Sequence, residues 1–272
     1  MQTQLRTSRL LEGKTAIITG AASPRGLGLA SARLLAEHGA CVLITDLDAA
    51  AAEAAAQTLP GRKHFGARCN VTDKAECEAA VALAVTHFGG VDILVNIAGI
   101  TSPQRLMEVT PEMYALVMDV NMRGTLYMTQ AVVPLMTGRP GRIVLVSGID
   151  SFQAMGGHSV LGAAKAAAES LVRGLALELG PLGVTVNAVT PGFVKTDSST
   201  YYVTQGLGLD YERATARLLA ATPVRRHGTP EDVAALVAYL VSDAASFLTG
   251  QCIVIDGGLT ITSPLSRMED GP

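Results

Sequence analysis

The fold is decided by residues 19–28, which read TGAASPRGLG and close the short apolar run Thr15–Thr19. Glycines in such a loop allow a tight turn and let the backbone approach a pyrophosphate group. A helix that begins at the end of the loop presents free N–H groups and the positive end of its dipole to the same anion. This stretch therefore predicts a strand–loop–helix unit that binds a dinucleotide. The candidate contacts in it are Gly20, Ser23, Arg25, Gly26, Leu27 and Gly28.

The rest of the chain repeats an alternation of short aliphatic runs and longer Ala-rich stretches. Six more strand-like runs follow the first, at Cys41–Thr45, His64–Asn70, Val91–Asn96, Arg142–Ser147, Val184–Val189 and Gln251–Ile255. Most are almost wholly apolar, which is typical of strands buried on both faces of a parallel sheet. We predict an α/β fold, a single Rossmann-type domain over residues 1–272 with a doubly wound, seven-stranded parallel sheet. Residues 1–10 and 263–272 are expected to be terminal tails.

Helices are predicted between these strands. The clearest are 29–38, Asp48–Leu59, Pro111–Met136 and His158–Leu179. Thr110 and Thr229 each precede a proline, as an N-cap precedes the first helical residue. Residues 193–221 contain no clear strand. Because they follow the sixth strand beyond its carboxyl end, they are expected to form a mobile substrate lid.

The composition excludes several classes of protein. With 49% hydrophobic and 17% charged residues the chain is not a disordered one. Four scattered cysteines are too few for a disulfide scaffold, and the histidines lack partners at metal-ligand spacing, so no metal site is expected. A net charge of −3 without a basic block gives no footprint for nucleic acid. No apolar run reaches the roughly 20 residues that span a bilayer, and the expected location is cytoplasmic.

Asp46 lies at the end of the second predicted strand, eighteen residues past Gly28. A carboxylate there can accept both ribose hydroxyls of NAD and would repel the 2′-phosphate of NADP. The alternative is an ordinary acid at the start of the next helix. Arg25 is the one feature that favours NADP. We therefore expect NAD, with NADP as the less favoured cofactor.

Further motifs occur in a fixed order. They are Asn96–Gly99 (NIAG), Asn121, Lys165, Pro191–Thr196 (PGFVKT) and 256–258 (DGG). Together with residues 19–28 they resemble the short-chain dehydrogenase/reductase family over residues 10–262. The resemblance implies a nicotinamide cofactor, a small-molecule substrate and a homotetramer or homodimer. It also implies cofactor contacts from Leu47, Asn70, Val71, Asn96, Ala98, Gly99, Lys165, Pro191, Gly192, Val194 and Thr196.

The active site departs from the family pattern of Ser, Tyr and Lys. The Tyr position, four residues before Lys165, holds Leu161, and the Ser position, seventeen before it, holds Gly148. The enoyl-acyl-carrier-protein reductase branch of the superfamily places its Tyr seven residues before the Lys and has two extra residues in its glycine loop. This chain resembles that branch in two respects: five residues separate Gly20 from Gly26, and the stretch Val160–Lys165 looks like that branch's helix. The residue seven before Lys165 is His158.

Four residues are the catalytic candidates. His158 lies two helical turns from Lys165, on the same face, and an imidazole exchanges protons near neutral pH. The alternative is that His158 is a capping or surface residue without a catalytic role. Lys165 lies among alanines on an apolar helix and needs a partner, such as ribose hydroxyls. Asn121 interrupts a good helix, and the family implies that it holds a proton-relaying water. Ser147 is a shifted hydrogen-bond donor.

Three functions remain open from the sequence. The first is an NAD(H)-dependent oxidoreductase for a secondary alcohol/ketone couple, with a non-standard proton donor, for which Tyr201 or Tyr202 of the lid is an alternative to His158. The second is reduction of an activated C=C bond. The third is an NAD-binding protein that has lost redox chemistry, such as a lyase, an isomerase or a non-catalytic protein. Surplus apolar faces on the helices Pro111–Met136 and His158–Leu179 favour a homo-oligomer.

Overall fold

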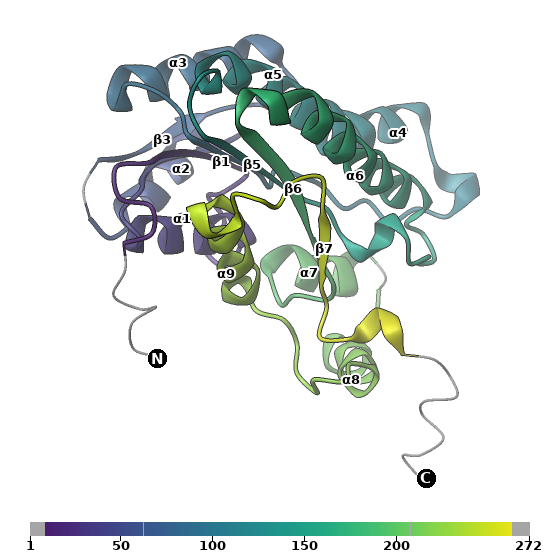
Figure 1. Ribbon diagram of the computed structural model, residues 1–272. Helices are drawn as coiled ribbons and strands as arrows, with labels where there is room; N and C mark the ends of the chain where they lie inside the picture. Colours follow the sequence, from purple (N-terminus) through teal and green to yellow (C-terminus); the bar gives the residue numbers. More distant parts are fainter. Residues whose placement is uncertain (1–8, 62, 207, 263–272) are drawn as a thin grey trace.

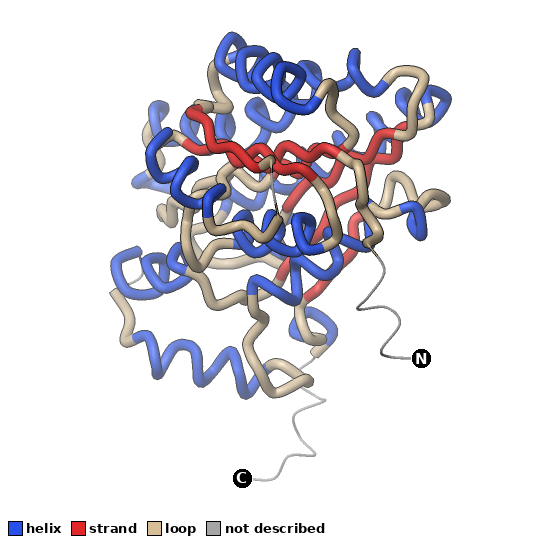
Figure 2. Tube along the Cα trace, turned by 90° about the vertical axis from the view of Figure 1, so that its left-hand side faces the viewer, coloured by secondary structure: helices blue, strands red, loops and turns tan. Residues whose placement is uncertain are grey.

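The computed structural model describes residues 9–262, apart from residues 62 and 207. The predicted tails lie outside these residues except for positions 9 and 10. Seven parallel strands form one sheet with the order β3-β2-β1-β4-β5-β6-β7, and helices cover both of its faces (Figures 1 and 2). The predicted fold class is confirmed. The strands are β1 (Thr15–Thr19), β2 (Cys41–Asp46), β3 (His64–Arg68), β4 (Ile93–Asn96), β5 (Gly141–Val146), β6 (Val184–Pro191) and β7 (Cys252–Ile255).

Nine α-helices connect or follow these strands in the described part of the chain. They are α1 (Leu27–Glu37), α2 (Ala49–Gln57), α3 (Lys74–Phe88), α4 (Pro111–Met118), α5 (Gly124–Met136), α6 (Ser159–Leu179), α7 (Asp197–Tyr201), α8 (Tyr211–Ala221) and α9 (Pro230–Val241). No helix among the described residues combines the length and the apolar character that crossing a membrane requires.

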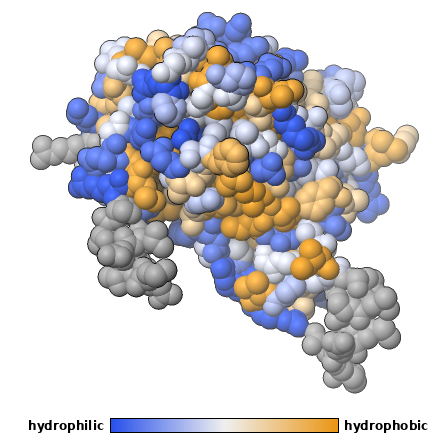
Figure 3. Space-filling view, viewed as in Figure 1, coloured by the Kyte–Doolittle hydropathy of each residue, from blue (hydrophilic) through white to orange (hydrophobic). Residues whose placement is uncertain are grey.

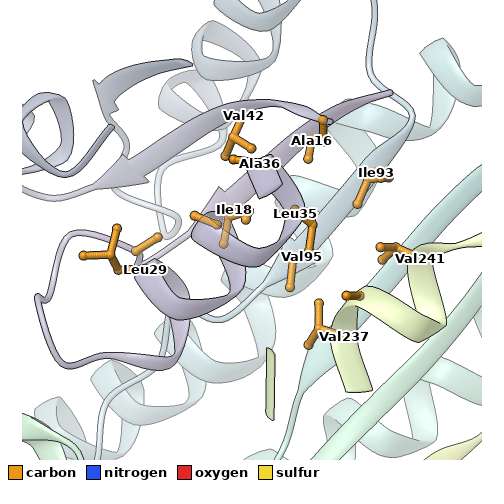
Figure 4. Close-up of a cluster of buried hydrophobic side chains, with 14 of the residues drawn as sticks. Ala16, Ile18, Leu29, Leu35, Ala36, Val42, Ile93, Val95, Val237 and Val241 are labelled. Atoms are coloured by element: carbon orange, nitrogen blue, oxygen red, sulfur yellow. The ribbon is translucent and has the colours of Figure 1, made fainter. Parts of the chain in front are cut away.

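The core consists of two apolar layers, one on each face of the sheet. Ala16 and Ile18 of β1 pack with α1 and α9 on one face (Figure 4), whereas Ile17 packs with α3, α5 and α6 on the other. This alternation follows from the period of two along a strand. Because both faces are covered, the central strands are apolar throughout, which explains the near-continuous runs in the sequence.

Strand boundaries differ from the predictions by at most two residues, and β1 has the predicted bounds. β3 ends at Arg68, so Cys69 and Asn70 lie beyond it, and β4 begins at Ile93 rather than Val91. β6 continues to Pro191, because residues 188–191 pair with β7. The expectation that Cys69 lies inside a strand is therefore wrong, although its side chain is buried.

The prediction of a single helix over Pro111–Met136 is wrong, because the helix is interrupted. It is divided into α4 and α5 by a π-helical turn, Asp119–Arg123, with Asn121 at its centre. The side-chain amide of Asn121 donates to the carbonyl of Val117 at 3.0 Å. A side chain that hydrogen-bonds four residues back competes with the helical backbone ladder, and this accounts for the distortion.

The described residues of the segment 193–221 contain no β-strand, as expected. They form α7 and α8, joined through a second π-helical turn, Tyr202–Gly206, and Val194 makes only an isolated bridge to Gly228. The segment follows the carboxyl end of β6, where bound molecules approach a parallel sheet.

Candidate active site

The glycine loop between β1 and α1 is closely packed. Gly20 has φ of +63°, and a Cβ added there would lie 2.7 Å from the Cα of Ala98. A Cβ on Gly28 would lie 2.5 Å from the Cα of Ala21. Gly26 is the N-cap of α1 and supplies no side-chain cap. The first N–H groups of α1 therefore have no intrahelical acceptor and suit an anion.

Asp46 connects the end of β2 to this loop. Its Oδ2 accepts a hydrogen bond from the N–H of Ala22 at 2.9 Å, and its Oδ1 accepts from the N–H of Leu47 at 2.8 Å. The alternative role, an acid at the start of the next helix, belongs to Asp48, which accepts from Ala50 and Ala51 at the N-terminus of α2. Asp46 is thus placed beside the glycine loop rather than used as a helix cap.

The NIAG segment after β4 lies against the same loop. The hydroxyl of Thr19 accepts hydrogen bonds from the N–H groups of Ile97 and Ala98, both at 3.1 Å. Asn96 is buried, and its amide donates to the hydroxyl of Thr129 at 3.5 Å. The structure therefore joins β1 and β4 where the glycine loop begins.

Two other predicted contact segments have local structural roles as well. Asn70 accepts from the N–H of Thr72 at 3.1 Å, and the buried Val71 packs against Gly124. In the segment Pro191–Thr196, a Cβ on Gly192 would lie 2.6 Å from the Cβ of Asp256. Thr196 caps α7 by accepting from the N–H of Ser199 at 3.0 Å.

Lys165 and Asn121 converge beside Gly99. A Cβ on Gly99 would lie 2.8 Å from Oδ1 of Asn121 and 3.5 Å from Nζ of Lys165. The Asn121 amide donates to the carbonyls of Ile100 and Val117, while its buried Oδ1 has no partner among the described residues. A buried acceptor of this kind calls for a donor from water or from a bound molecule.

The Lys165 ammonium donates to the carbonyl of Val146 at 3.1 Å. Burial lowers the pKa of Lys165 to about 8, opposed by the charges of Asp150 and Glu169. Glu169 was not foreseen from the sequence. Its Oε1 accepts from the hydroxyls of Ser151 and Thr190, both at 2.8 Å. Its place on α6, one turn past Lys165, is the only signal that the sequence offers.

The family's Tyr and Ser positions are occupied differently here. Leu161 is 4% exposed and packs in an apolar cluster with Val117 and Ala164. A Cβ on Gly148 would lie 3.3 Å from Oδ2 of Asp150, so a carboxylate borders the space of the absent serine. Ser147, the neighbouring hydroxyl, is buried and donates to the carbonyl of Lys165 at 3.5 Å.

His158 pairs with Asp150, a residue that the sequence did not single out. Nδ1 of His158 lies 2.5 Å from Oδ1 of Asp150, and the buried Nε2 has no partner in the part of the chain that the structure describes. His158 precedes α6 as its N-cap residue, but its side chain makes no cap bond and is 5% exposed, so the surface alternative is wrong. Its ring centroid lies 4.6 Å from that of Tyr202 in the segment 193–221.

Close packing at Gly162 brings Asp150 to this position. Asp150 belongs to the short 3-10 turn Ile149–Ser151 after β5, and a Cβ on Gly162 would lie 2.7 Å from its carbonyl oxygen. The turn therefore rests directly on the first turns of α6. The two tyrosines of the segment 193–221 differ in exposure. Tyr201 is 66% exposed, whereas burial and the charge of Asp150 raise the pKa of Tyr202.

Comparisons with known proteins concern the chain as a whole. Residues 20–260 match the family model described as Enoyl-(Acyl carrier protein) reductase. The chain is 37% identical over 260 residues to an uncharacterized short-chain type dehydrogenase/reductase, y4mP, of Sinorhizobium fredii, which covers 93% of this chain and 99% of that protein. It is 38% identical over 250 residues to the 3-oxoacyl-[acyl-carrier-protein] reductase FabG of Vibrio cholerae, with coverage of 92% and 98%.

A solved structure from Sinorhizobium meliloti, assigned to the short-chain alcohol dehydrogenases, superimposes with a TM-score of 0.85. The two chains are 29% identical, and the match covers 93% of this chain and 98% of the other. The chain belongs to the short-chain dehydrogenase/reductase family and is related to its oxidoreductases.

Proposed function

We propose that the protein is an NAD(H)-dependent oxidoreductase that interconverts a secondary alcohol and a ketone, with His158 as the group that exchanges the substrate proton. The observation that carries this proposal is the Asp150–His158 pair, in which Nδ1 is held at 2.5 Å and Nε2 is left without a partner. The carboxylate of Asp150 borders Gly148, the position where the family has its Ser.

The donors and acceptors of the site fit a nicotinamide dinucleotide. The uncapped start of α1 suits the pyrophosphate, and the Asp46 carboxylate suits ribose hydroxyls. Lys165 makes a single hydrogen bond through Nζ, and its remaining N–H groups suit the second ribose. When bound, the nicotinamide accepts or donates the hydride. We propose the same cofactor contacts as the sequence predicts, from Leu47, Asn70, Val71, Asn96, Gly99 and Pro191–Thr196.

His158 would act through Nε2 in both directions. Asp150 would accept a hydrogen bond from Nδ1–H, and this bond would orient the ring and select its tautomer. In alcohol oxidation, neutral Nε2 takes the hydroxyl proton as the C–H hydride leaves. In ketone reduction, protonated Nε2 returns a proton to the developing alkoxide oxygen. A positioned acid or base of this kind contributes about 10²–10⁴ in rate.

Reduction of an activated C=C bond is the second candidate. It is favoured by the five residues between Gly20 and Gly26, by the seven-residue spacing of His158 and Lys165, and by the description of the matching family model. The FabG relatives are named 3-oxoacyl reductases, and an oxo group is a carbonyl, which favours the first candidate.

A substrate panel separates the two candidates. The panel pairs each secondary alcohol with its ketone and includes matched enones, and turnover is followed by NADH absorbance. We expect reduction of the saturated ketones and no reduction of the C=C bond of the matched enones. Selective turnover of enones would favour the second candidate. NADH binding without turnover of any compound would favour the non-redox alternative, which the buried Leu161 supports.

Several sequence expectations stay predictions. They are the single-domain organisation, the substrate lid at residues 193–221, the cytoplasmic location and the homotetramer or homodimer. An interface between copies is supported by the broad apolar surface in Figure 3, which lies over the edge strand β7 in the orientation of Figure 1. Exposed apolar side chains near this edge include Val254 of β7 and Phe247 just before it.

A further inference from the structure

The glycine loop is bound to the segment 193–221 by an ion pair. Nε of Arg25 donates to Oδ1 of Asp197 at 2.6 Å, and a second guanidinium nitrogen contacts the same oxygen. The hydroxyl of Ser23 donates to Oδ2 of Asp197 at 3.2 Å. Both donors lie among the five residues between Gly20 and Gly26. The longer loop thus supplies two contacts to the first residue of α7.

The positive charge of Arg25 is balanced by the negative charge of Asp197 in this ion pair. Asp197 raises the pKa of Arg25 through the hydrogen bond and its charge, and Arg25 in turn lowers the pKa of Asp197. Tyr211 of α8 adds a smaller electrostatic effect in the same direction. Arg25 is the only Lys or Arg in residues 19–28, so the loop offers no other cation to an incoming phosphate.

The same loop faces the position that distinguishes NAD from NADP. Asp46 binds the N–H of Ala22, three residues before Arg25. A carboxylate at the end of the second strand is placed to meet the adenosine ribose, and an arginine nearby can accommodate a 2′-phosphate. Arg25 is the only arginine within residues 19–28, and Asp197 already occupies its guanidinium.

We propose that Asp197 is a determinant of selectivity for NAD over NADP, because it holds Arg25 on α7 and withdraws its charge from a 2′-phosphate. The proposal rests on the proposed nicotinamide cofactor but not on the role of His158. Asp46 repels the phosphate directly, whereas Asp197 acts by occupying the group that would attract it. Asp46 therefore acts on the 2′-phosphate itself, and Asp197 acts on the arginine that would bind this phosphate.

The expected effect is modest, because the pair is exposed. The side chains of Arg25 and Asp197 are 76% and 37% exposed, and exposed ion pairs change an equilibrium constant by up to about fivefold. The test is the Asp197→Asn variant, with NADH and NADPH dissociation constants measured by fluorescence titration. We expect NADPH to bind about fivefold more tightly and NADH affinity to change by less than about twofold.

Two further variants make the result specific. Asp197→Asn combined with Arg25→Ala should lose the gain for NADPH, because the freed cation is gone. Asp210→Asn makes the same charge change in the same segment, at the N-cap of α8, and should leave the NADPH to NADH ratio unchanged. The gain in Asp197→Asn should shrink as salt is added. Asp197→Ala, with circular dichroism as a check of folding, replaces the Asn variant if that protein does not fold.

The outcomes separate this proposal from the proposed function. Parallel changes in both affinities, or an unchanged ratio in a folded Asp197 variant, would overturn the selectivity role and leave the ion pair as an anchor for the segment 193–221. A wild-type protein that binds neither NADH nor NADPH would overturn both proposals. Tight binding of dinucleotide without turnover would count against the oxidoreductase reaction alone.

Discussion

The carboxylate of Asp150 lies 2.5 Å from Nδ1 of His158, although the two residues belong to different elements. Asp150 follows β5 in a short turn, and His158 immediately precedes α6. The pair occupies the end of the sheet where the family has its catalytic Ser and Tyr positions, here Gly148 and Leu161. A carboxylate–imidazole pair therefore lies beside Gly148, the position of the family's Ser.

Removing the Asp150 charge should impair turnover more than binding. In Asp150→Asn the imidazole loses the acceptor that selects its tautomer, and we expect kcat to fall by about 10²- to 10⁴-fold, within the range of general acid–base catalysis. KM for the substrate should change little. Asp243→Asn, which alters an exposed carboxylate paired with Arg142, is the matched control. A similar kcat for Asp150→Asn and the control would argue against a positioning role.

Restoring the family's tyrosine at position 161 should not restore the family's chemistry. Leu161 is buried with Val117 and Ala164, and a larger polar side chain there overpacks the cluster. We expect Leu161→Tyr to lower the free energy of unfolding by about 1–3 kcal/mol, measured in urea. Leu161→Met conserves volume and should cost less than about 1.5 kcal/mol. A Tyr variant as stable as wild type and faster in turnover would show that the phenol reaches the substrate.

Because of Lys165, the free energy of unfolding should depend on pH in the alkaline range. Its pKa is about 8 in the folded protein against 10.5 for a free lysine, so the unfolded chain binds more protons between these values. Stability should then rise as pH increases through this window, by about 3 kcal/mol for a full shift of this size. The measurement is urea unfolding of wild type and Lys165→Met from pH 7 to about pH 10.5. Parallel curves for the two proteins would contradict the burial of the ammonium.

Substitutions of the neighbouring residues Asp46 and Asp48 should have separate effects, the first on cofactor binding and the second on helix stability. Asp46→Ala removes the group beside the glycine loop, and we expect about tenfold weaker NADH binding, about 1.4 kcal/mol. Asp48→Ala removes the N-cap of α2 and should cost about 1 kcal/mol of stability while NADH affinity is kept. Equal effects of both variants on NADH affinity would remove the ribose role of Asp46.

The sequence predicted best what depends on local pattern. Apolar runs identified the buried strands, Asp46 was placed at the end of β2, and Asn121 was recognised as an interruption of its helix. Contacts between distant residues were not predictable. Arg25 and Asp197 are 172 positions apart, and their meeting depends on how the segment after β6 returns to the glycine loop. Asp150 and His158 are only 8 apart, but their contact requires the close packing at Gly162, which no periodicity reveals.

The role of His158 is tested most directly by single-turnover hydride transfer with NADH and a ketone identified from the panel. The rates to compare are those of wild type, His158→Gln and His87→Gln, the last being an exposed histidine of α3 that lies outside the site. We predict a loss of about 10²- to 10⁴-fold in His158→Gln and a wild-type rate in His87→Gln. A wild-type rate in a folded His158→Gln protein that still binds NADH would contradict the account.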